Sequence, residues 1–299
     1  MLRRAMRAAG ARSVVASENH GRKVAGDVSS AFLNWLDDKP DDRPYFAFLN
    51  YFDSHDPYYA EAPFDTLFGP VRPMTLNWGA VPDTAQISAW TDGYDRSLAF
   101  LDDALGRLFD ELQRRGTLDE TVVIITSDHG EHLGEQGFMR HGTTLYMPVL
   151  HVPLIVRFPP AVPGGLRVEA PVTLRDIPAT VLDLIGANDN ELAGKTLASR
   201  WLEPGRAGSP VYSEVREALR IPTRYPNAKA DLYSLLDGQH HYIRSSDDTE
   251  ELYLYSEDPH QSRNMAAEGA AEAVLAGLRA DLRRQLGGEL RTAGGDTLR

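Results

Sequence analysis

The sequence of 299 residues contains no cysteine. This absence excludes disulfide bonds and every metal site built from thiolates, although it does not fix the cellular compartment. A metal site in this chain would therefore use the oxygen and nitrogen atoms of Asp, Glu and His side chains. Such donors suit Ca²⁺, Mg²⁺, Mn²⁺ or Zn²⁺.

The sequence also lacks a long apolar run and an excess of positive charge. A membrane-spanning helix needs about 20 apolar residues, and Arg7 and Arg12 interrupt the apolar core that a signal peptide needs. The 31 basic and 43 acidic residues give a formal net charge of −12, which argues against a nucleic-acid partner. A metal ion and a few basic groups can still attract a small anionic ester. Localisation and oligomeric state are left open.

The strongest functional signal lies between residues 121 and 158. An apolar, β-branched run at 122–126 is typical of a strand buried on both faces, and it stops just before Asp128 and His129. A carboxylate and an imidazole thus follow a buried strand, and ligands of open α/β sheets bind at the carboxyl ends of strands. These two side chains together suit a divalent metal.

A second imidazole follows in a turn. His141 lies between Arg140 and Gly142, and a further apolar run at 152–158 predicts another buried strand. The planar guanidinium of Arg140 can clamp a tetrahedral anion, although a basic residue in a glycine turn is usually solvated.

The order of the predicted elements brings a third histidine toward this region. Residues 45–50 predict a short buried strand that leads into His55, and an amphipathic helix over 83–116 connects it to the strand at 121–126. A strand, a helix and a strand in this order indicate a crossover between parallel strands. The loops after both strands would then meet at one edge of the sheet.

The remaining elements indicate a second, smaller subdomain. From about residue 205 the sequence changes to short strands separated by turns, with a final helix. We predict an α/β domain over residues 1–205 and an α+β subdomain over 206–299, the latter an antiparallel sheet with a helix against it. The further predicted helices and strands are 24–36, 177–184, 211–215, 232–236, 240–244, 251–255 and 270–286.

Four stretches resemble motifs of the sulfatase family, within the alkaline phosphatase superfamily, in the family's order. Residues 128–158 resemble its metal-binding segment, 48–58 its substrate-site loop, 176–186 its D-x-x-P-T helix and 251–266 its C-terminal strand and turn. This resemblance implies an alkaline-phosphatase-like α/β sheet with helices on both faces, plus the small C-terminal antiparallel sheet.

The resemblance also implies roles for five residues. Asp128 and His129 would bind a divalent metal, with Ca²⁺ as the ion that the family suggests and Mn²⁺, Mg²⁺ or Zn²⁺ left open. His141 would bind the oxygens of a sulfate or phosphate group, with Arg140 as the second candidate. His55 would contact the oxyanion or protonate the leaving group, because imidazole titrates near neutral pH. From spacing alone, a metal ligand and a helix N-cap beside a surface histidine are equally good interpretations of Asp128 and His129, and His55 could be a turn residue.

One motif of the family is missing. Its nucleophile belongs to a Cys/Ser-x-Pro-x-Arg motif near the N-terminus, and this chain contains neither Cys nor a Ser-x-Pro-x-Arg sequence. We therefore expect the sheet to be incomplete and the chain to be the C-terminal portion of a longer hydrolase, inactive by itself. A signal or anchor segment could then lie upstream.

The activity expected of the intact protein is metal-dependent hydrolysis of a sulfate ester. One alternative is a phosphodiesterase, phosphonate monoester hydrolase or phosphoryl transferase on the same scaffold, because tetrahedral SO₄ and PO₄ centres need similar clamps. The other is a non-catalytic fragment or pseudoenzyme that binds anions. The identity of the nucleophile separates these possibilities.

A charged patch follows the expected metal ligands. Glu131, His132 and Glu135 predict a solvated face or partners that support the ligands. On this interpretation, replacing His132 with Ala is expected to be tolerated.

Overall fold

The computed structural model describes residues 22–40, 43–187, 194–203, 205, 208–287, 290–291 and 297–298. The chain forms two compact units, one from residues 1–76 and 82–118 and the other from residues 77–81 and 119–299. Each unit is described by itself. The predicted division into 1–205 and 206–299 follows a different boundary and stays a prediction.

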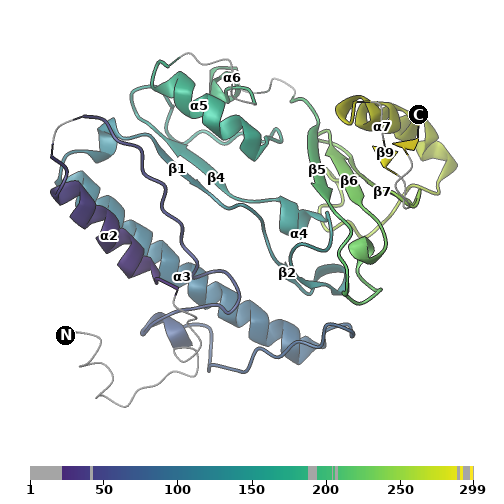
Figure 1. The fold of residues 1–299 in the computed structure, drawn as a ribbon, viewed down its shortest axis with the longest axis horizontal. Helices are drawn as coiled ribbons and strands as arrows, with labels where there is room; N and C mark the ends of the chain where they lie inside the picture. Colours follow the sequence, from purple (N-terminus) through teal and green to yellow (C-terminus); the bar gives the residue numbers. More distant parts are fainter. Residues whose placement is uncertain are drawn as a thin grey trace. The chain divides into compact units, whose positions relative to one another are not determined.

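Two helices dominate the first unit (Figure 1). Helix α2 spans Ala25–Asp37, and α3 spans Thr84–Arg114. A capping box starts α3, because the side chain of Asp83 accepts a hydrogen bond from the Gln86 N–H (2.8 Å) and Gln86 Oε1 accepts from the Asp83 N–H (3.0 Å). The contact between the helices is built on Ala25, Phe100 and Ala104. The predicted helices at 24–36 and 83–116 are thus confirmed.

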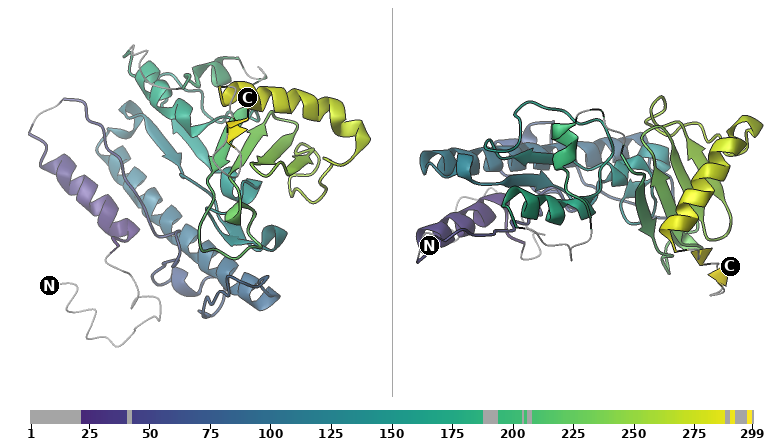
Figure 2. Two further views of the ribbon diagram at one scale, coloured as in Figure 1. Left: turned by 45° about the vertical axis from the view of Figure 1, so that its right-hand side comes forward. Right: turned by 90° about the horizontal axis from the view of Figure 1, so that it is seen from above.

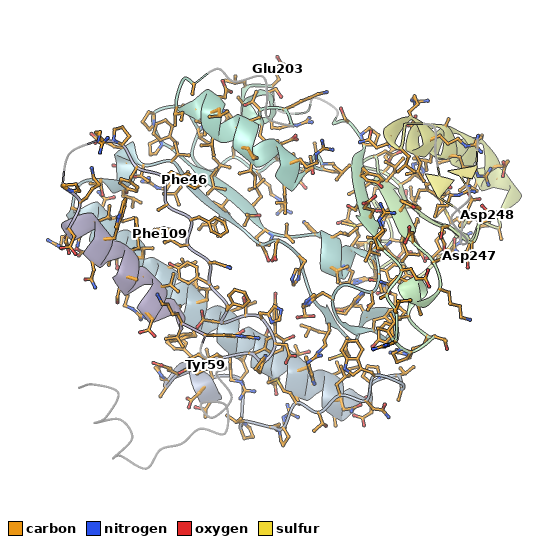
Figure 3. All side chains as sticks on the ribbon, viewed as in Figure 1. Phe46, Tyr59, Phe109, Glu203, Asp247 and Asp248 are labelled. Atoms are coloured by element: carbon orange, nitrogen blue, oxygen red, sulfur yellow. The ribbon has the colours of Figure 1, made fainter. Side chains whose placement is uncertain are left out.

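The expected strand at 45–50 is not formed. These residues belong to the first unit and take part in no strand ladder among the described residues. Phe46 and Phe48 are 81% and 80% exposed. Figure 3 shows the side chain of Phe46 on this segment. A strand requires a neighbour for its N–H and C=O groups, and residues 45–50 have none in the described part of the chain. Without this strand, the predicted crossover between parallel strands is also not observed.

The second unit contains an antiparallel strand pair where the sequence predicted two fully buried strands. Strand β1 (Val123–Thr126) pairs with β4 (Leu154–Arg157), Thr126 opposite Leu154. Thr126 is exposed and Ile155 is 55% exposed, so burial on both faces is wrong for this pair. A short hairpin of β2 (His132–Leu133) and β3 (Met139–Arg140) lies between them in sequence.

The chain also contains several short helices and helical turns. They are α4 (Met147–Leu150), α5 (Ile177–Leu184), α6 (Ala198–Leu202), and the 3-10 turns Phe64–Thr66, Leu118–Glu120, Glu135–Gly137, Leu174–Asp176, Pro226–Ala228 and Gly269–Ala271. Helix α5 has the predicted bounds and ends where Gly186 takes a φ of 71°, which a glycine adopts without strain. None of the helices in the described part of the chain combines the length and apolar character of a membrane span.

The small C-terminal sheet, drawn in green in Figure 2, is antiparallel, as predicted. Its strand order is β5-β6-β7-β8. Its strands are β5 (Val211–Val215), β6 (Leu232–Leu236), β7 (His241–Ser245) and β8 (Glu250–Tyr253), and α7 (Glu272–Gln285) packs on one face. Leu275, Leu278 and Leu282 of α7 are buried against Tyr242 and Leu252. The opposite face carries Leu232, Ile243 and Tyr253, which pack against Leu145. Two further short strands are β9 (Leu290–Arg291) and β10 (Thr297–Leu298).

Candidate metal and anion site

The turn after β1 is held by a glycine that nothing larger can replace. The Gly130 N–H donates to the Val149 carbonyl oxygen at 2.9 Å, which ties the turn to α4. A Cβ atom on Gly130 would lie 2.1 Å from the Pro148 carbonyl oxygen. This close approach of two backbone segments explains the glycine directly after Asp128 and His129.

Asp128 and His129 present two donor atoms to the same side of this turn. The Asp128 side chain is 87% exposed, and its Oδ2 lies 3.7 Å from His129 Nε2. His129 Nδ1 lies 2.9 Å from the Gly130 carbonyl oxygen, which can only accept, so Nδ1 carries the hydrogen and Nε2 is the acceptor nitrogen. A cation with bonds of about 2.0–2.4 Å to each donor can bridge such a separation. The donor set therefore fits a divalent metal.

His141 lies directly against this pair. Its ring stacks on that of His129 with 3.9 Å between centroids and 27° between planes. His141 Nδ1 is 3.2 Å from Oε1 of Glu131, whose side chain is only 5% exposed. A carboxylate at this position holds the hydrogen on Nδ1 and turns Nε2 outward from Glu131. Glu131 is therefore a supporting partner of His141, one of the two options that the sequence left open.

The turn after His141 is fixed by a residue that the sequence did not single out. Asn227 is fully buried, and its Nδ2 donates to the carbonyl oxygens of Gly142 at 3.1 Å and Arg216 at 3.0 Å. Its backbone N–H also donates to the Thr143 carbonyl oxygen at 3.4 Å. The loop between β5 and β6 thereby holds the His141 turn in place, and no local signal in the sequence reveals so distant a pairing.

Arg140 lies at the end of β3 rather than in a solvated turn. Its guanidinium lies over the Trp78 ring, 5.1 Å from the centroid. Its backbone has a φ of 68°, in the left-handed region that residues other than glycine seldom adopt. The structure thus brings Asp128, His129 and His141 together, with Arg140 adjacent in the chain, while their roles stay predictions.

His132 differs from the expectation of a solvated patch. It is fully buried in β2, its Nε2 lies 2.8 Å from Thr144 Oγ1, and its ring packs against Phe138 at 5.6 Å. Glu135 lies beside it, with Oε2 3.7 Å from His132 Nδ1. Burial raises the pKa of Glu135, but the nearby His132 and the hydrogen bond from the Leu133 N–H outweigh burial and lower that pKa below its usual value. His132 is therefore a packing residue and not part of a solvated patch, while the expected tolerance of metal binding and activity to His132→Ala stays a prediction.

His55 belongs to the first unit, so its expected meeting with His129 and His141 stays a prediction. Within its own unit, the His55 loop is well tied. His55 Nδ1 lies 2.7 Å from the Asp56 carbonyl oxygen, and Arg22 donates to the carbonyl oxygens of Asp56 (3.0 Å) and His55 (3.4 Å). The ring of Phe52 packs beside His55 at 5.7 Å.

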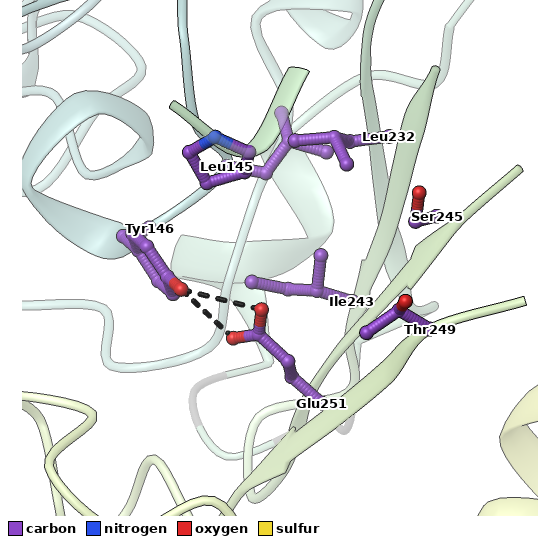
Figure 4. Close-up of a pocket in the computed structure, with 8 residues that line it drawn as sticks. Leu145, Tyr146, Leu232, Ile243, Ser245, Thr249 and Glu251 are labelled. Atoms are coloured by element: carbon purple, nitrogen blue, oxygen red, sulfur yellow. Dashed lines mark hydrogen bonds between the residues drawn. The ribbon is translucent and has the colours of Figure 1, made fainter. Parts of the chain in front are cut away.

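A small cavity in the second unit lies elsewhere, between α4 and the C-terminal sheet (Figure 4). The Tyr146 hydroxyl donates to Glu251 at 2.9 Å across it, and Tyr253 donates to the same carboxylate at 2.5 Å. Its walls are otherwise mostly apolar, with Leu145, Leu232 and Ile243. This cavity is a packing gap around a satisfied carboxylate and contains none of the predicted site residues.

Comparison with known proteins places the chain in a family. The family model for sulfatases matches residues 22–187, which is more than half of the chain. The chain belongs to the sulfatase family. A choline-sulfatase of Rhizobium meliloti is 25% identical over 248 residues, covering 75% of this chain and 46% of that protein. The arylsulfatase K of Mus musculus is 32% identical over 180 residues, covering 58% of this chain and 32% of that protein. The chain thus spans less than half the length of these sulfatase relatives.

Solved structures support the same fold. The phosphonate monoester hydrolase of Agrobacterium radiobacter has a TM-score of 0.71 and 24% identity, covering 93% of this chain and 66% of that chain. The match to the phosphonate monoester hydrolase of Silicibacter pomeroyi has the same TM-score of 0.71, and it covers 65% of that hydrolase chain. The alkaline-phosphatase-like α/β class predicted from the sequence is therefore confirmed.

Proposed function

We propose that the second unit of this sulfatase-family chain binds a divalent cation through Asp128 and His129 and the oxygens of a sulfate ester through His141 and Arg140. The stacking of His129 on His141 at 3.9 Å carries this proposal. This contact places the proposed metal ligands, Asp128 and His129, beside the proposed anion-binding residue, His141. On this proposal the protein hydrolyses a small sulfate ester, as expected for a sulfatase-family hydrolase.

Each residue has a distinct task on this proposal. A bound cation, with Ca²⁺ as the first candidate, would supply electrostatic stabilisation of charge on the ester oxygens. His141 donates to an ester oxygen from Nε2 when its ring is protonated, while its Nδ1 faces Glu131 at 3.2 Å. Arg140 offers the N–H groups of its planar fork to the same tetrahedral group. We further propose that His55 protonates the leaving alkoxide.

A phosphonate or phosphate ester is the second candidate substrate. The structural likeness to phosphonate monoester hydrolases over 93% of this chain favours it. A tetrahedral phosphonate presents oxygens much like those of a sulfate, so the same cationic groups would bind it. A non-catalytic role in anion binding is the third candidate, because the nucleophile has no identified position in this sequence.

Metal titration of the purified chain tests the first part of the proposal. We expect Ca²⁺ or Mn²⁺ to bind at one site in calorimetry, and Asp128→Asn to abolish that binding because it removes the charged ligand. Glu257→Gln, which removes an exposed carboxylate in the same unit, is the matched control and should bind metal normally. Normal metal binding by Asp128→Asn would disprove the assigned ligands.

Turnover distinguishes the candidate substrates. Release of nitrophenol from aryl sulfate and aryl phosphonate esters would be measured with added Ca²⁺ or Mn²⁺. Faster metal-dependent hydrolysis of the sulfate supports the first candidate, and faster hydrolysis of the phosphonate supports the second. Anion binding without turnover of either ester supports the non-catalytic role.

A further inference from the structure

We infer that Trp78 is a positioning residue that holds the Arg140 guanidinium ready for a tetrahedral oxyanion. This inference rests on the proposed function, in which Arg140 contacts the ester oxygens. Nothing in the sequence marked Trp78, which lies in a short segment far from Arg140 in the chain. Residues 77–81 nevertheless belong to the second unit, unlike the residues on either side of them.

The backbone conformation of Arg140 indicates that more than one contact fixes the position of this residue. A φ of 68° is strained in a residue with a β-carbon, so it persists only where the surroundings impose it. One constraint is the β2–β3 ladder, in which Arg140 pairs with His132. The other is the Trp78 ring, whose centroid lies 5.1 Å from the guanidinium carbon of Arg140.

Stacking on an aromatic face suits an arginine that must also bind an anion. The indole ring attracts the guanidinium above it by a cation–π interaction, which uses none of the N–H donors of Arg140. These donors are then available to a tetrahedral oxyanion, which can accept two of them. The stacked guanidinium also loses less conformational freedom on binding than a mobile one.

Trp78 is itself anchored, which makes it a rigid support. Its ring packs on Tyr225 at 5.7 Å, and Tyr225 is only 2% exposed and packs on Phe138 at 5.6 Å. Arg224 lies over Tyr225 at 4.8 Å and donates to the Gly137 carbonyl oxygen. Guanidinium groups and aromatic rings therefore stack in one cluster, with Arg140 at the end next to His141.

The inference predicts how anion affinity depends on the indole. Binding of sulfate and inorganic phosphate to the full chain would be measured by calorimetry for a set of variants. Trp78→Leu keeps apolar bulk but removes the π face, and we expect about tenfold weaker binding of both anions. Trp78→Phe keeps an aromatic face and should stay within about threefold of the unaltered chain. Trp201→Phe, in α6 of the same unit, is the matched control and should bind normally.

A double-mutant cycle with Arg140→Ala separates positioning from general packing. If Trp78 acts through Arg140, the double variant binds no more weakly than Arg140→Ala alone. A second measurement requires no destabilising variant. The Arg140 Nε–H signal in NMR spectra, assigned by its loss in Arg140→Lys, should be shifted upfield by the indole ring and should move when sulfate is added.

The outcomes distinguish the inference from the function on which it rests. Normal affinity of Trp78→Leu with lost affinity of Arg140→Ala overturns the inference and leaves the proposed function standing. Additive losses in the double variant, or an Nε–H signal without the ring-current shift, also overturn the inference. Normal affinity of Arg140→Ala, or no anion binding by the unaltered chain, overturns both.

Discussion

At the scale of single residues, close backbone approach decides which side chains the candidate site tolerates. Gly130 is the sharpest case, because its missing side chain lets the turn that carries Asp128 and His129 lie against α4. A methyl group there would collide with a carbonyl oxygen of the main chain, which cannot swing away as a side-chain end can.

Gly130→Ala should therefore destabilise the protein by about 1–3 kcal/mol and weaken metal binding, because the turn must move. Gly277→Ala is the control: this glycine lies exposed inside α7 with open space around it, so alanine should stabilise by about 0.5–1 kcal/mol. Urea unfolding followed by circular dichroism measures both. Equal stability of the two variants would show that the turn relaxes freely.

His132→Ala is expected to lower stability by about 2–3 kcal/mol while leaving metal content unchanged. The substitution removes a buried ring, leaves the Thr144 hydroxyl without its 2.8 Å partner and opens a cavity beside Phe138. Unfolding curves and metal analysis of the same sample test this pair of effects. A stable variant that has lost its metal would instead make His132 a ligand.

Local sequence patterns explain which candidate residues could be predicted from the sequence. Asp128, His129 and His141 follow or precede apolar runs, so pattern and resemblance together pointed to them as candidates. Asn227 and Trp78 act across long separations in the chain, and a single sequence carries no record of such pairings. Their roles became visible only through hydrogen bonds and ring contacts in the structure.

At the scale of elements, the C-terminal sheet combines an apolar core with one buried imidazole. His241 in β7 is fully buried, and its Nδ1 lies 2.7 Å from Gln261 Nε2, while Gln261 Oε1 accepts from the Met147 N–H. The Gln261 amide therefore donates to His241 Nδ1, which requires a neutral ring. The other ring nitrogen has no hydrogen-bond partner among the described residues.

Burial lowers the pKa of His241 to about 4. The unfolded chain, with a His pKa of about 6.5, takes up the proton first. Stability is therefore complete above pH 6.5 and falls by about 3 kcal/mol as the pH drops toward 4. His241→Gln should remove this part of the slope in urea unfolding between pH 7 and 4, whereas His260→Gln, which removes an exposed imidazole, should keep it. An unchanged slope in His241→Gln would refute this account.

The elements that the sequence predicted best are those whose signal is local. Helix α3 has an apolar stripe and a capping box, and turn-forming residues separate the strands of the C-terminal sheet. The predicted positions of these elements were therefore correct within a few residues. The crossover between parallel strands was predicted worst, because residues 45–50 form no strand. The apolar run that forms β1 says nothing about its partner, and β4 joins it antiparallel.

At the scale of the whole molecule, the first unit leaves an apolar surface exposed. Residues 46–50 lie beside α2 and line a groove with Phe32 and Trp35. Phe46 and Phe48 alternate along this segment and are the most exposed aromatic side chains of the groove, at 81% and 80%. A contiguous apolar patch with an unpaired main chain favours association with another chain of the same kind.

We therefore expect the purified chain to self-associate, and the double substitution Phe46→Ser with Phe48→Ser to shift it toward monomer. The apolar area removed from water on association is the driving force, and serine forfeits most of it. Leu219→Ser is the control, because Leu219 is equally exposed, at 80%, but lies in a loop of the second unit outside this groove. Sedimentation velocity across a concentration series measures the effect. A monomeric unaltered chain, or an equal shift in Leu219→Ser, would show that the groove is not where the copies meet.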